Sequence, residues 1–249
     1  MVDLNGRVAL VTGGGKGIGR GIASALAAGG AAVVVNYAAD RSSAEATVAG
    51  IVGNGGKAVA VAGDVGSPDD VERVFQRANA AFGPVDTLVN NAGVYSFQPL
   101  EDITPGEFDR QYRTNVLGVF LTCQAFVKQV PEDGGSIVNI STSDISANSP
   151  GSALYTSTKG AVTQLTRVLA NELGARNIRV NAVAAGATDT EGSRAAGLVN
   201  DESVAGVSRI TPLGRLGQPD DIGSAVALLA SPDAAWITGD VIFASGGLR

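Results

Sequence analysis

Short apolar runs alternate along the chain with segments in which apolar residues recur at helical spacing. The runs predict strands at 7–11, 32–36, 58–62, 86–89, 137–140, 179–184 and 241–244. Helices are predicted between them, including one from Ser67 to about Phe82 and one over 219–229. Because strands and helices alternate, we expect one α/β domain over 1–249, built as a doubly wound parallel sheet with helices on both faces.

A glycine-rich turn joins the first predicted strand to the first predicted helix. Residues 12–19 read TGGGKGIG, and Ile22 and Leu26 then follow at helical spacing. Glycines allow a tight turn and let a pyrophosphate approach backbone N–H groups at the positive end of the helix. An ordinary tight turn would look similar, but the strand at 32–36 completes a βαβ unit. The context therefore favours a Rossmann-like dinucleotide site.

The end of the second predicted strand bears on which dinucleotide is bound. Asn36 and Tyr37 stand where an acidic residue would accept both ribose hydroxyls of NAD. A neutral residue tolerates a 2′-phosphate, which Lys16 and Arg41 could neutralise, so NADP(H) is favoured and NAD(H) stays possible. Asp40 would repel the phosphate if it faced the pocket. Alternatively, Asp40 and Arg41 are simply the start of a solvated helix.

Tyr155 and Lys159 are four residues apart in what reads as the first turn of a helix, so their side chains share one face. Val162 and Leu169 continue that face as an apolar one, so Lys159 either extends outward to solvent or serves a site. An adjacent cation typically lowers a phenol pKa by roughly 1 to 3. We therefore expect Tyr155 to act as an acid or base near neutral pH, unless the spacing is accidental.

Polar residues follow other predicted elements. The strand at 86–89 ends at Asn90-Asn91-Ala92-Gly93, and a capping box at Thr104 begins a long helix that carries Asn115. Hydroxyl residues at 141–143 follow the strand at 137–140. The segment from Gly186 to about Thr211 has no firm periodicity and is expected to be a mobile lid.

Composition narrows the classes of function. The net charge of −6 and the pI near 4.7 do not favour binding to nucleic acid or to an anionic membrane. The chain has no histidine, which excludes His-ligated zinc and Ser-His-Asp hydrolysis, and we expect no metal. A lone cysteine, Cys123, excludes an intrachain disulfide. Without an apolar span or a signal peptide at the start, the expected location is the cytoplasm.

These motifs occur in a characteristic order. The chain has a strand followed by TGGGKGIG, then NNAG, Asn115 on the next helix, hydroxyls after the fifth strand, and YTSTK at 155–159. In this order the chain resembles the short-chain dehydrogenase/reductases over essentially its whole length. Stretches such as 33–38 and 93–97 look most similar to the 3-oxoacyl-carrier-protein reductase and trihydroxynaphthalene reductase branches.

The resemblance implies catalytic roles. Tyr155 would protonate the substrate oxygen during reduction, while Lys159 lowers the Tyr155 pKa and binds the nicotinamide ribose. Asn115 would hold a water that links Lys159 to solvent. The family's serine stands 13 residues before the tyrosine, and 155 − 13 = 142, which is Thr142 here. Thr142 carries the same hydroxyl donor, and Ser143 is a possible substitute.

The resemblance also implies a set of cofactor contacts. Besides Tyr155 and Lys159, these are Gly13, Gly15, Lys16, Gly17, Ile18, Gly19, Asn36, Tyr37, Asp64, Val65, Asn91, Ala92, Gly93, Gly186, Thr188 and Thr190. Two places depart from the family pattern, namely Ala185-Gly186 where Pro-Gly is usual and Ser245-Gly246-Gly247 where Asp-Gly-Gly is usual. The family further implies a homotetramer joined through the helices that bear Asn115 and Tyr155 and through the last strand.

The function expected from this pattern is NADPH-dependent reduction of a ketone or 3-oxoacyl carbonyl to the secondary alcohol. The alternative within enzymes is an NAD-dependent dehydrogenase of a secondary alcohol or sugar. A non-catalytic dinucleotide sensor is the alternative from another class, and the intact catalytic set argues against it. Tyr95, Phe97, Asn148, Leu154 and the lid are expected to line the substrate site, with Tyr95 and Phe97 suiting a flat or apolar small molecule.

Overall fold

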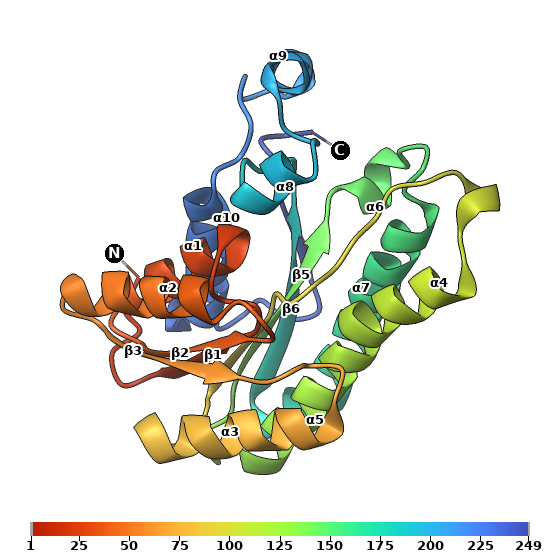
Figure 1. Ribbon diagram of the computed structural model, residues 1–249. Coiled ribbons are helices and arrows are strands. Elements are labelled where there is room, and N and C mark those ends of the chain that lie inside the picture. The colour runs from red at the N-terminus through yellow and green to blue at the C-terminus, as the bar shows by residue number, and fades with distance from the viewer. Residues whose placement is uncertain (1, 249) are drawn as a thin grey trace.

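The computed structural model describes residues 2–248. Its centre is a seven-stranded parallel sheet with the order β3-β2-β1-β4-β5-β6-β7 (Figure 1). The strands are β1 (Val8–Val11), β2 (Ala32–Tyr37), β3 (Lys57–Ala62), β4 (Thr87–Asn90), β5 (Gly135–Thr142), β6 (Ile178–Ala185) and β7 (Val241–Ala244). The predicted fold class, a Rossmann-like doubly wound sheet, is confirmed, and all seven predicted strands are present within a few residues of their expected bounds.

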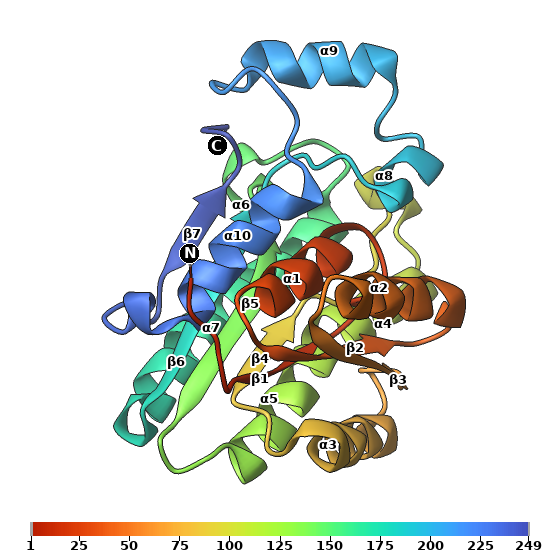
Figure 2. The same cartoon turned by 90° about the vertical axis from the view of Figure 1, so that its left-hand side faces the viewer.

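Helices cover both faces of the sheet (Figures 1 and 2). One face carries α1 (Gly17–Ala28), α2 (Arg41–Gly53) and α10 (Pro219–Ala230). The other carries α3 (Pro68–Phe82), α5 (Gly118–Gln129) and α7 (Ala153–Leu173), with α4 (Pro105–Tyr112) before α5. Short helices α6 (Asp144–Ala147), α8 (Glu191–Ala195) and α9 (Asp201–Ile210) lie beyond the carboxyl ends of the strands.

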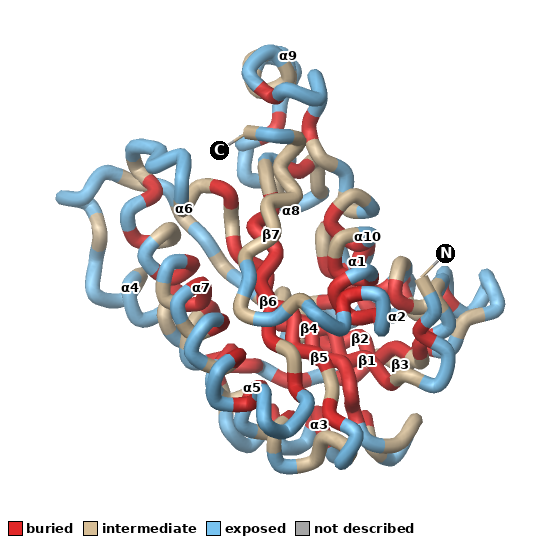
Figure 3. Tube along the Cα trace, turned by 180° about the vertical axis from the view of Figure 1, so that it is seen from behind, coloured by how far each residue is buried: buried red, intermediate tan, exposed pale blue. Residues whose placement is uncertain are grey.

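Each strand feeds two hydrophobic cores because its side chains alternate between the two faces. In β1, Ala9 and Val11 pack into the core beneath α1 and α10, whereas Val8 and Leu10 pack into the core above α3, α5 and α7. The buried positions therefore run continuously through the central strands (Figure 3). This explains why the strands read as unbroken apolar runs rather than alternating ones.

A series of hydrogen-bonded polar side chains is buried in the core between the sheet and helices α5 and α7, next to the central strands β4 and β5. Asn90 donates to Asn139 Oδ1 at 2.9 Å and accepts from the Thr122 hydroxyl at 2.6 Å, and Asn139 donates to Thr166 Oγ1 at 2.9 Å. Asn90 and Asn139 are directly paired across β4 and β5. These buried polar groups thus satisfy one another by hydrogen bonds.

The helix that carries Asn115 is not one continuous α-helix. Between α4 and α5, residues Arg113–Leu117 form a π-helical turn, and Asn115 lies within it. At the start of α4, Thr104 accepts from the Glu107 amide as predicted. The Glu107 carboxylate, however, accepts from Ser96 and Arg110, so it does not complete the predicted capping box at Thr104.

The segment expected to lack regular structure contains two helices, α8 and α9, so that part of the lid prediction is wrong. Each begins with a capping box in which a serine takes the third helical position, Ser193 after Thr190 and Ser203 after Asn200. Helix α9 stands away from the sheet (Figure 2). Among residues 2–248, no helix combines the length and the apolar character needed to cross a bilayer.

Replacing Asn139 with alanine should destabilise the protein by about 2–4 kcal/mol. The change leaves the Asn90 amide and the Thr166 hydroxyl without their buried partner. Urea unfolding measures the effect. Gln124→Ala, at an exposed position of α5, is the control and should stay within about 0.5 kcal/mol of the parent. Equal stability of the two variants would contradict the role given to this series of polar side chains.

Candidate active site

A cleft opens where the carboxyl ends of the central strands meet the start of α1. It brings together many of the residues predicted as a site, namely Gly13, Lys16, Gly17, Ile18, Gly19, Asn91, Ala92, Gly93, Thr142, Tyr155, Lys159, Gly186 and Thr190. They come from six separate stretches of chain. Ligands of open α/β sheets bind at this edge, so the location agrees with the sequence-based expectation.

The glycine turn before α1 requires glycine for steric reasons. Gly13 and Gly17 have φ values of +59° and +52°, a region that L side chains rarely adopt. A Cβ on Gly19 would lie 2.2 Å from the Gly13 carbonyl oxygen. The glycines therefore let the backbone pass close to itself at the start of α1, where an anionic group is favoured.

The segment after β4 fixes this turn in place. Asn91 Nδ2 donates to the carbonyls of Thr12 and Gly13 at 2.9 and 3.0 Å. The Thr12 hydroxyl in turn accepts from the amides of Asn91 and Ala92. The Asn91 side chain is thus a brace between two loops, and the backbone of 91–93 forms a wall of the cleft.

Tyr155 and Lys159 lie on one face of α7 and both border the cleft. Lys159 is 5% exposed, and its ammonium donates to the Ile140 carbonyl at 2.8 Å and lies 5.8 Å from the centre of the Tyr155 ring. Lys159 therefore does not extend outward to solvent. Burial lowers its pKa from 10.5 to about 8.

The pKa of the Tyr155 phenol is not shifted in the direction expected from the nearby Lys159 ammonium. Burial raises its pKa above the ordinary value of 10, and the charges of Tyr95 and Asp144 raise it further. The expected lowering of this pKa by Lys159 is therefore wrong, because desolvation disfavours the phenolate and the net pKa is raised. Tyr155 is consequently a neutral phenol, the form that can give up a proton.

Asn115 connects the catalytic helix to the loop after β4. Its Nδ2 donates to the Val94 carbonyl at 2.8 Å and to Thr158 Oγ1 at 3.1 Å, and its Oδ1 accepts from the Val94 amide at 2.8 Å. The π-helical turn aims this amide at both partners. The side chain thus positions the Tyr155 helix, and the water-holding role stays a prediction.

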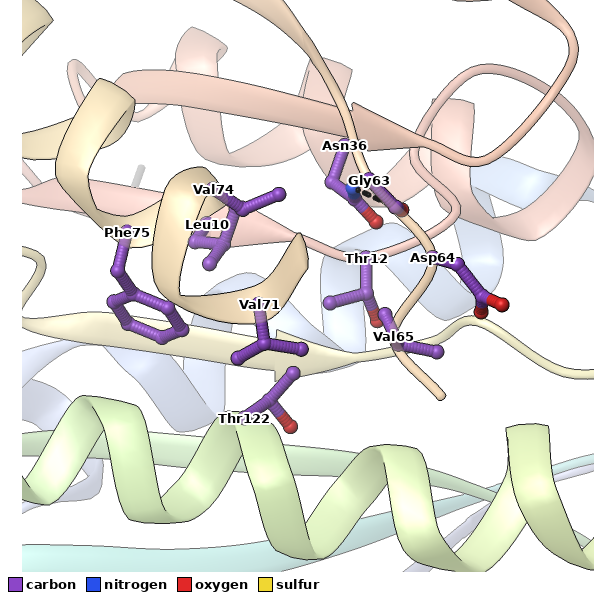
Figure 4. A pocket seen from close by; sticks show the side chains of 10 residues that line it. All are labelled: Leu10, Thr12, Asn36, Gly63, Asp64, Val65, Val71, Val74, Phe75 and Thr122. Atoms are coloured by element: carbon purple, nitrogen blue, oxygen red, sulfur yellow. Dashed lines mark hydrogen bonds between the residues drawn. The ribbon is translucent and has the colours of Figure 1, made fainter. Parts of the chain in front are cut away.

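The Asn36 side chain is directed into the interior (Figure 4). It accepts from the Gly13 amide at 3.4 Å and donates to the carbonyls of Val61 and Gly63, and it is 2% exposed. With Asp64 and Val65 it borders a hollow of about 10 Å³, which has room for about one water. Asn36 therefore joins the turn to the end of β3, and its side-chain amide is not turned toward the cleft.

Both cations considered for a 2′-phosphate are paired with carboxylates. Lys16 Nζ lies 3.1 Å from Asp40 Oδ2, and Arg41 Nε lies 2.7 Å from Glu45 Oε1. Asp40 also caps α2 by accepting from the Ser43 amide, and this bond, followed by the one from Lys16, lowers the Asp40 pKa. Asp40 and Arg41 are thus the solvated start of α2, with Lys16 attached to it.

Glu191 is a site residue that no sequence signal indicated. Its carboxylate accepts from the Gly17 amide at 3.2 Å, and its other oxygen lies 2.6 Å from Arg20 Nη2. Gly17 is the first residue of α1, so the carboxylate occupies the position that favours an anion. Glu191 and Gly17 lie 174 residues apart, so only the fold reveals the contact.

A second cavity of about 550 Å³ adjoins the cleft at Tyr155 and Thr142. This volume is typical of a small-molecule site. The rings of Tyr95, Phe97 and Tyr155 meet with centroids 5.7–5.9 Å apart, and residues of α8 and α9 close the far side. Thr188 borders this cavity rather than the cleft. Leu154 is buried and Asn148 is exposed, and neither is among the residues that border it.

Replacing Lys159 with methionine should make the free energy of unfolding less dependent on pH between about 7 and 10.5. The folded pKa of about 8 lies below the ordinary 10.5, so stability from Lys159 is present above pH 10.5 and is lost as pH falls through 8. The free-energy advantage of the variant over the parent should therefore shrink by about 3 kcal/mol between pH 7 and 10.5. Urea unfolding of both proteins checks this, and a pH-independent difference would contradict the buried charge.

Comparison with known proteins adds to this geometry. A family model described as enoyl-(acyl carrier protein) reductase matches residues 13–249. An uncharacterised oxidoreductase of Methylorubrum extorquens is 51% identical over the full length of both chains. A versicolorin reductase of Emericella nidulans is 40% identical, with 98% of this chain and 96% of the relative covered.

Two solved structures are similar in fold and sequence. A short-chain dehydrogenase/reductase from Serratia marcescens superposes with a TM-score of 0.91, 34% identity and 98% of each chain covered. A blue fluorescent protein from a metagenomic library, solved in complex with NADPH, superposes with a TM-score of 0.91 and 35% identity, and 99% of each chain is covered. Together with the cleft, these matches show that the chain belongs to the short-chain dehydrogenase/reductase family of NAD(P)-dependent enzymes acting on carbonyl or alcohol groups.

Proposed function

We propose that this protein reduces the ketone of a small cyclic or aromatic compound to the secondary alcohol, with NADPH as the hydride source. The observation that carries the proposal is the neutral Tyr155 phenol, which stands where the dinucleotide cleft and the substrate cavity meet. The rings of Tyr95 and Phe97 beside it suit a flat partner. A 3-oxoacyl chain is the second substrate class in view, and the same phenol would serve it.

The residues of the cleft fit a dinucleotide. The Gly17 amide already binds one anion, the Glu191 carboxylate, so the start of α1 can hold a pyrophosphate in the same manner. Gly13, Gly15, Lys16, Ile18 and Gly19 complete that turn. Asn91, Ala92 and Gly93, with Lys159, border the space for the nicotinamide ribose, and Gly186 and Thr190 border its far side, whereas Thr188 borders the adjoining substrate cavity. Bound there, the nicotinamide supplies a hydride to the carbonyl carbon.

Side chains of this protein donate a proton and a hydrogen bond to the carbonyl oxygen of the substrate. Tyr155 delivers its proton to that oxygen, and the Lys159 ammonium stabilises the phenolate that remains. Thr142 Oγ1 accepts from the Asp144 amide at 3.3 Å, which leaves its hydrogen free for the same oxygen. Thr142 borders both cavities, whereas Ser143 borders only the substrate cavity, so we assign the second donor to Thr142.

The choice of NADP(H) over NAD(H) is supported by the neutral end of β2 at Asn36 and Tyr37 and by the NADPH-bound relative. Against it stands the carboxylate of Asp40, which already pairs with Lys16. Binding a 2′-phosphate would exchange that pair for one between Lys16 and the phosphate. Fluorescence titration with NADPH and NADH decides the matter, and tighter binding of NADH would favour the NAD-dependent dehydrogenase instead.

We also propose a homotetramer located in the cytoplasm. Leu117 and Phe120 on the α4–α5 segment and Val168 on α7 are exposed by 41–44%, and Trp236 before β7 is fully exposed. Leu117, Phe120 and Val168 lie on the helical segments through which the family resemblance implies assembly, and Trp236 lies just before the last strand. Light scattering gives the mass in solution: about four times 24.9 kDa supports the tetramer, and a monomer contradicts it.

Replacing Tyr155 with phenylalanine should lower ketone reduction by a factor of about 10² to 10⁴ while leaving NADPH affinity within about threefold. The hydroxyl that supplies the proton is lost, but the ring that borders the cleft stays. Tyr112→Phe is the matched control because the Tyr112 hydroxyl bonds to Ser157, outside both cavities. Turnover of Tyr155→Phe equal to that of the control would refute the proposed role.

Replacing Glu191 with glutamine should tighten NADPH binding by about three- to tenfold. The parent carboxylate competes with the dinucleotide phosphates for the Gly17 amide and is held there by Arg20. Glu202→Gln on α9 removes an exposed carboxylate elsewhere on the lid and should leave the dissociation constant unchanged. Weaker binding by Glu191→Gln would show that Glu191 contacts the nucleotide favourably.

A further inference from the structure

Asp144 carries the one charged side chain among the described residues that line the substrate cavity. The other walls are aromatic, aliphatic or hydroxyl-bearing, with Phe97, Val207, Ile210 and Leu248 among them. No lysine or arginine of residues 2–248 forms an ion pair with Asp144. The cavity thus contains a carboxylate without a balancing cation on its wall.

The loop between β5 and α7 keeps this carboxylate ionised. Asp144 Oδ1 accepts from the Ser149 hydroxyl and, at 3.3 Å, from the Ser149 amide, and Oδ2 accepts from Thr156 Oγ1 at 3.1 Å. Partial burial raises the pKa of Asp144, but these bonds together with one from Ser152 outweigh it, and the net pKa lies below 3.8. Asp144 is therefore an anion near neutral pH.

The negative charge of Asp144 lies close to Thr142 and Tyr155, the two residues proposed to bond to the substrate oxygen. Asp144 is the second residue after Thr142, and its amide donates to the Thr142 hydroxyl. It also adds to the unfavourable potential at the Tyr155 oxygen. The nearest compensating cation on the catalytic helix, Lys159, donates to Ile140 on the cleft side and does not line the substrate cavity. A second anion placed beside the carbonyl would meet this charge in a partly desolvated space.

We propose that Asp144 is a specificity-determining residue that admits uncharged or cationic carbonyl compounds and rejects those with an anionic group near the carbonyl. The inference rests on the proposed ketone reduction and adds the charge class of the substrate. At separations of several ångströms and an effective dielectric constant of about 20, like charges discriminate by about tenfold or more. Carboxylated and phosphorylated ketones are thereby excluded, whereas esters, quinones and ring ketones are accepted.

The experiment compares two aromatic ketones that differ in charge, methyl 4-acetylbenzoate and 4-acetylbenzoate, with NADPH as reductant. The parent protein should favour the ester in kcat/KM by at least tenfold. Asp144→Asn keeps the size and an acceptor oxygen but removes the charge, and it should reduce that preference by about tenfold. Asp144→Glu should restore it.

Two controls separate charge from loop structure. Ser149→Ala removes a hydrogen bond from the loop but leaves the Asp144 charge, so the preference for the ester should persist. Asp69→Asn removes an exposed carboxylate from α3, away from both cavities, and should have no effect on the preference. Loss of preference in Ser149→Ala equal to that in Asp144→Asn would overturn the proposal in favour of a structural role for Asp144.

Calorimetric binding of both ketones to the NADP-loaded protein distinguishes this inference from the proposed function. A protein that binds the ester more tightly than the carboxylate but reduces neither would contradict ketone reduction and keep the role of Asp144. Equal kcat/KM for both compounds in the parent, or equal affinities, would overturn the role of Asp144 and leave ketone reduction in place. An unchanged preference in Asp144→Asn would do the same.

Discussion

The active site depends on the hydrogen bond from the buried Lys159 ammonium to the Ile140 carbonyl. A cation in this position loses most of its hydration, and one backbone oxygen at the end of β5 replaces part of it. The bond fixes where α7 lies against the sheet, and Tyr155 is one helical turn away on the same face. Because Asn115 links α7 to the loop after β4, the positions of the phenol, the cleft wall and the sheet edge are set together.

The fold could be predicted from the sequence because each prediction depended on the properties of residues close together along the chain. Fully buried parallel strands must be apolar on both faces, so β1 and β2 were visible as uninterrupted runs. The glycine turn was visible because its backbone angles and the approach of Gly19 to Gly13 admit no other residue. Tyr155 and Lys159 could be paired because helical periodicity alone puts them on one face.

Features decided by tertiary contacts could not be predicted in this way. The inward turn of Asn36, the pairing of Lys16 with Asp40 and the contact of Glu191 with Gly17 each join segments more than 20 residues apart. Helix α8 has five residues, too few to show a period, and in the capping boxes of α8 and α9 serine stands at the third helical position in place of the usual Glu or Gln. The raised pKa of Tyr155 reflects desolvation and the nearby charges of Tyr95 and Asp144, which the spacing of Tyr155 and Lys159 does not report.

The π-helical turn at Arg113–Leu117 limits how the chain can change in length. Such a turn holds one residue more than a turn of α-helix, so deleting one residue here would restore a regular α-helix and change which side chains the turn presents. The Asn115 amide would then lose the position from which it bonds to Val94 and Thr158. Surface loops such as 131–134 are free of this constraint, so natural insertions and deletions should accumulate there and avoid the segment from α4 to α5.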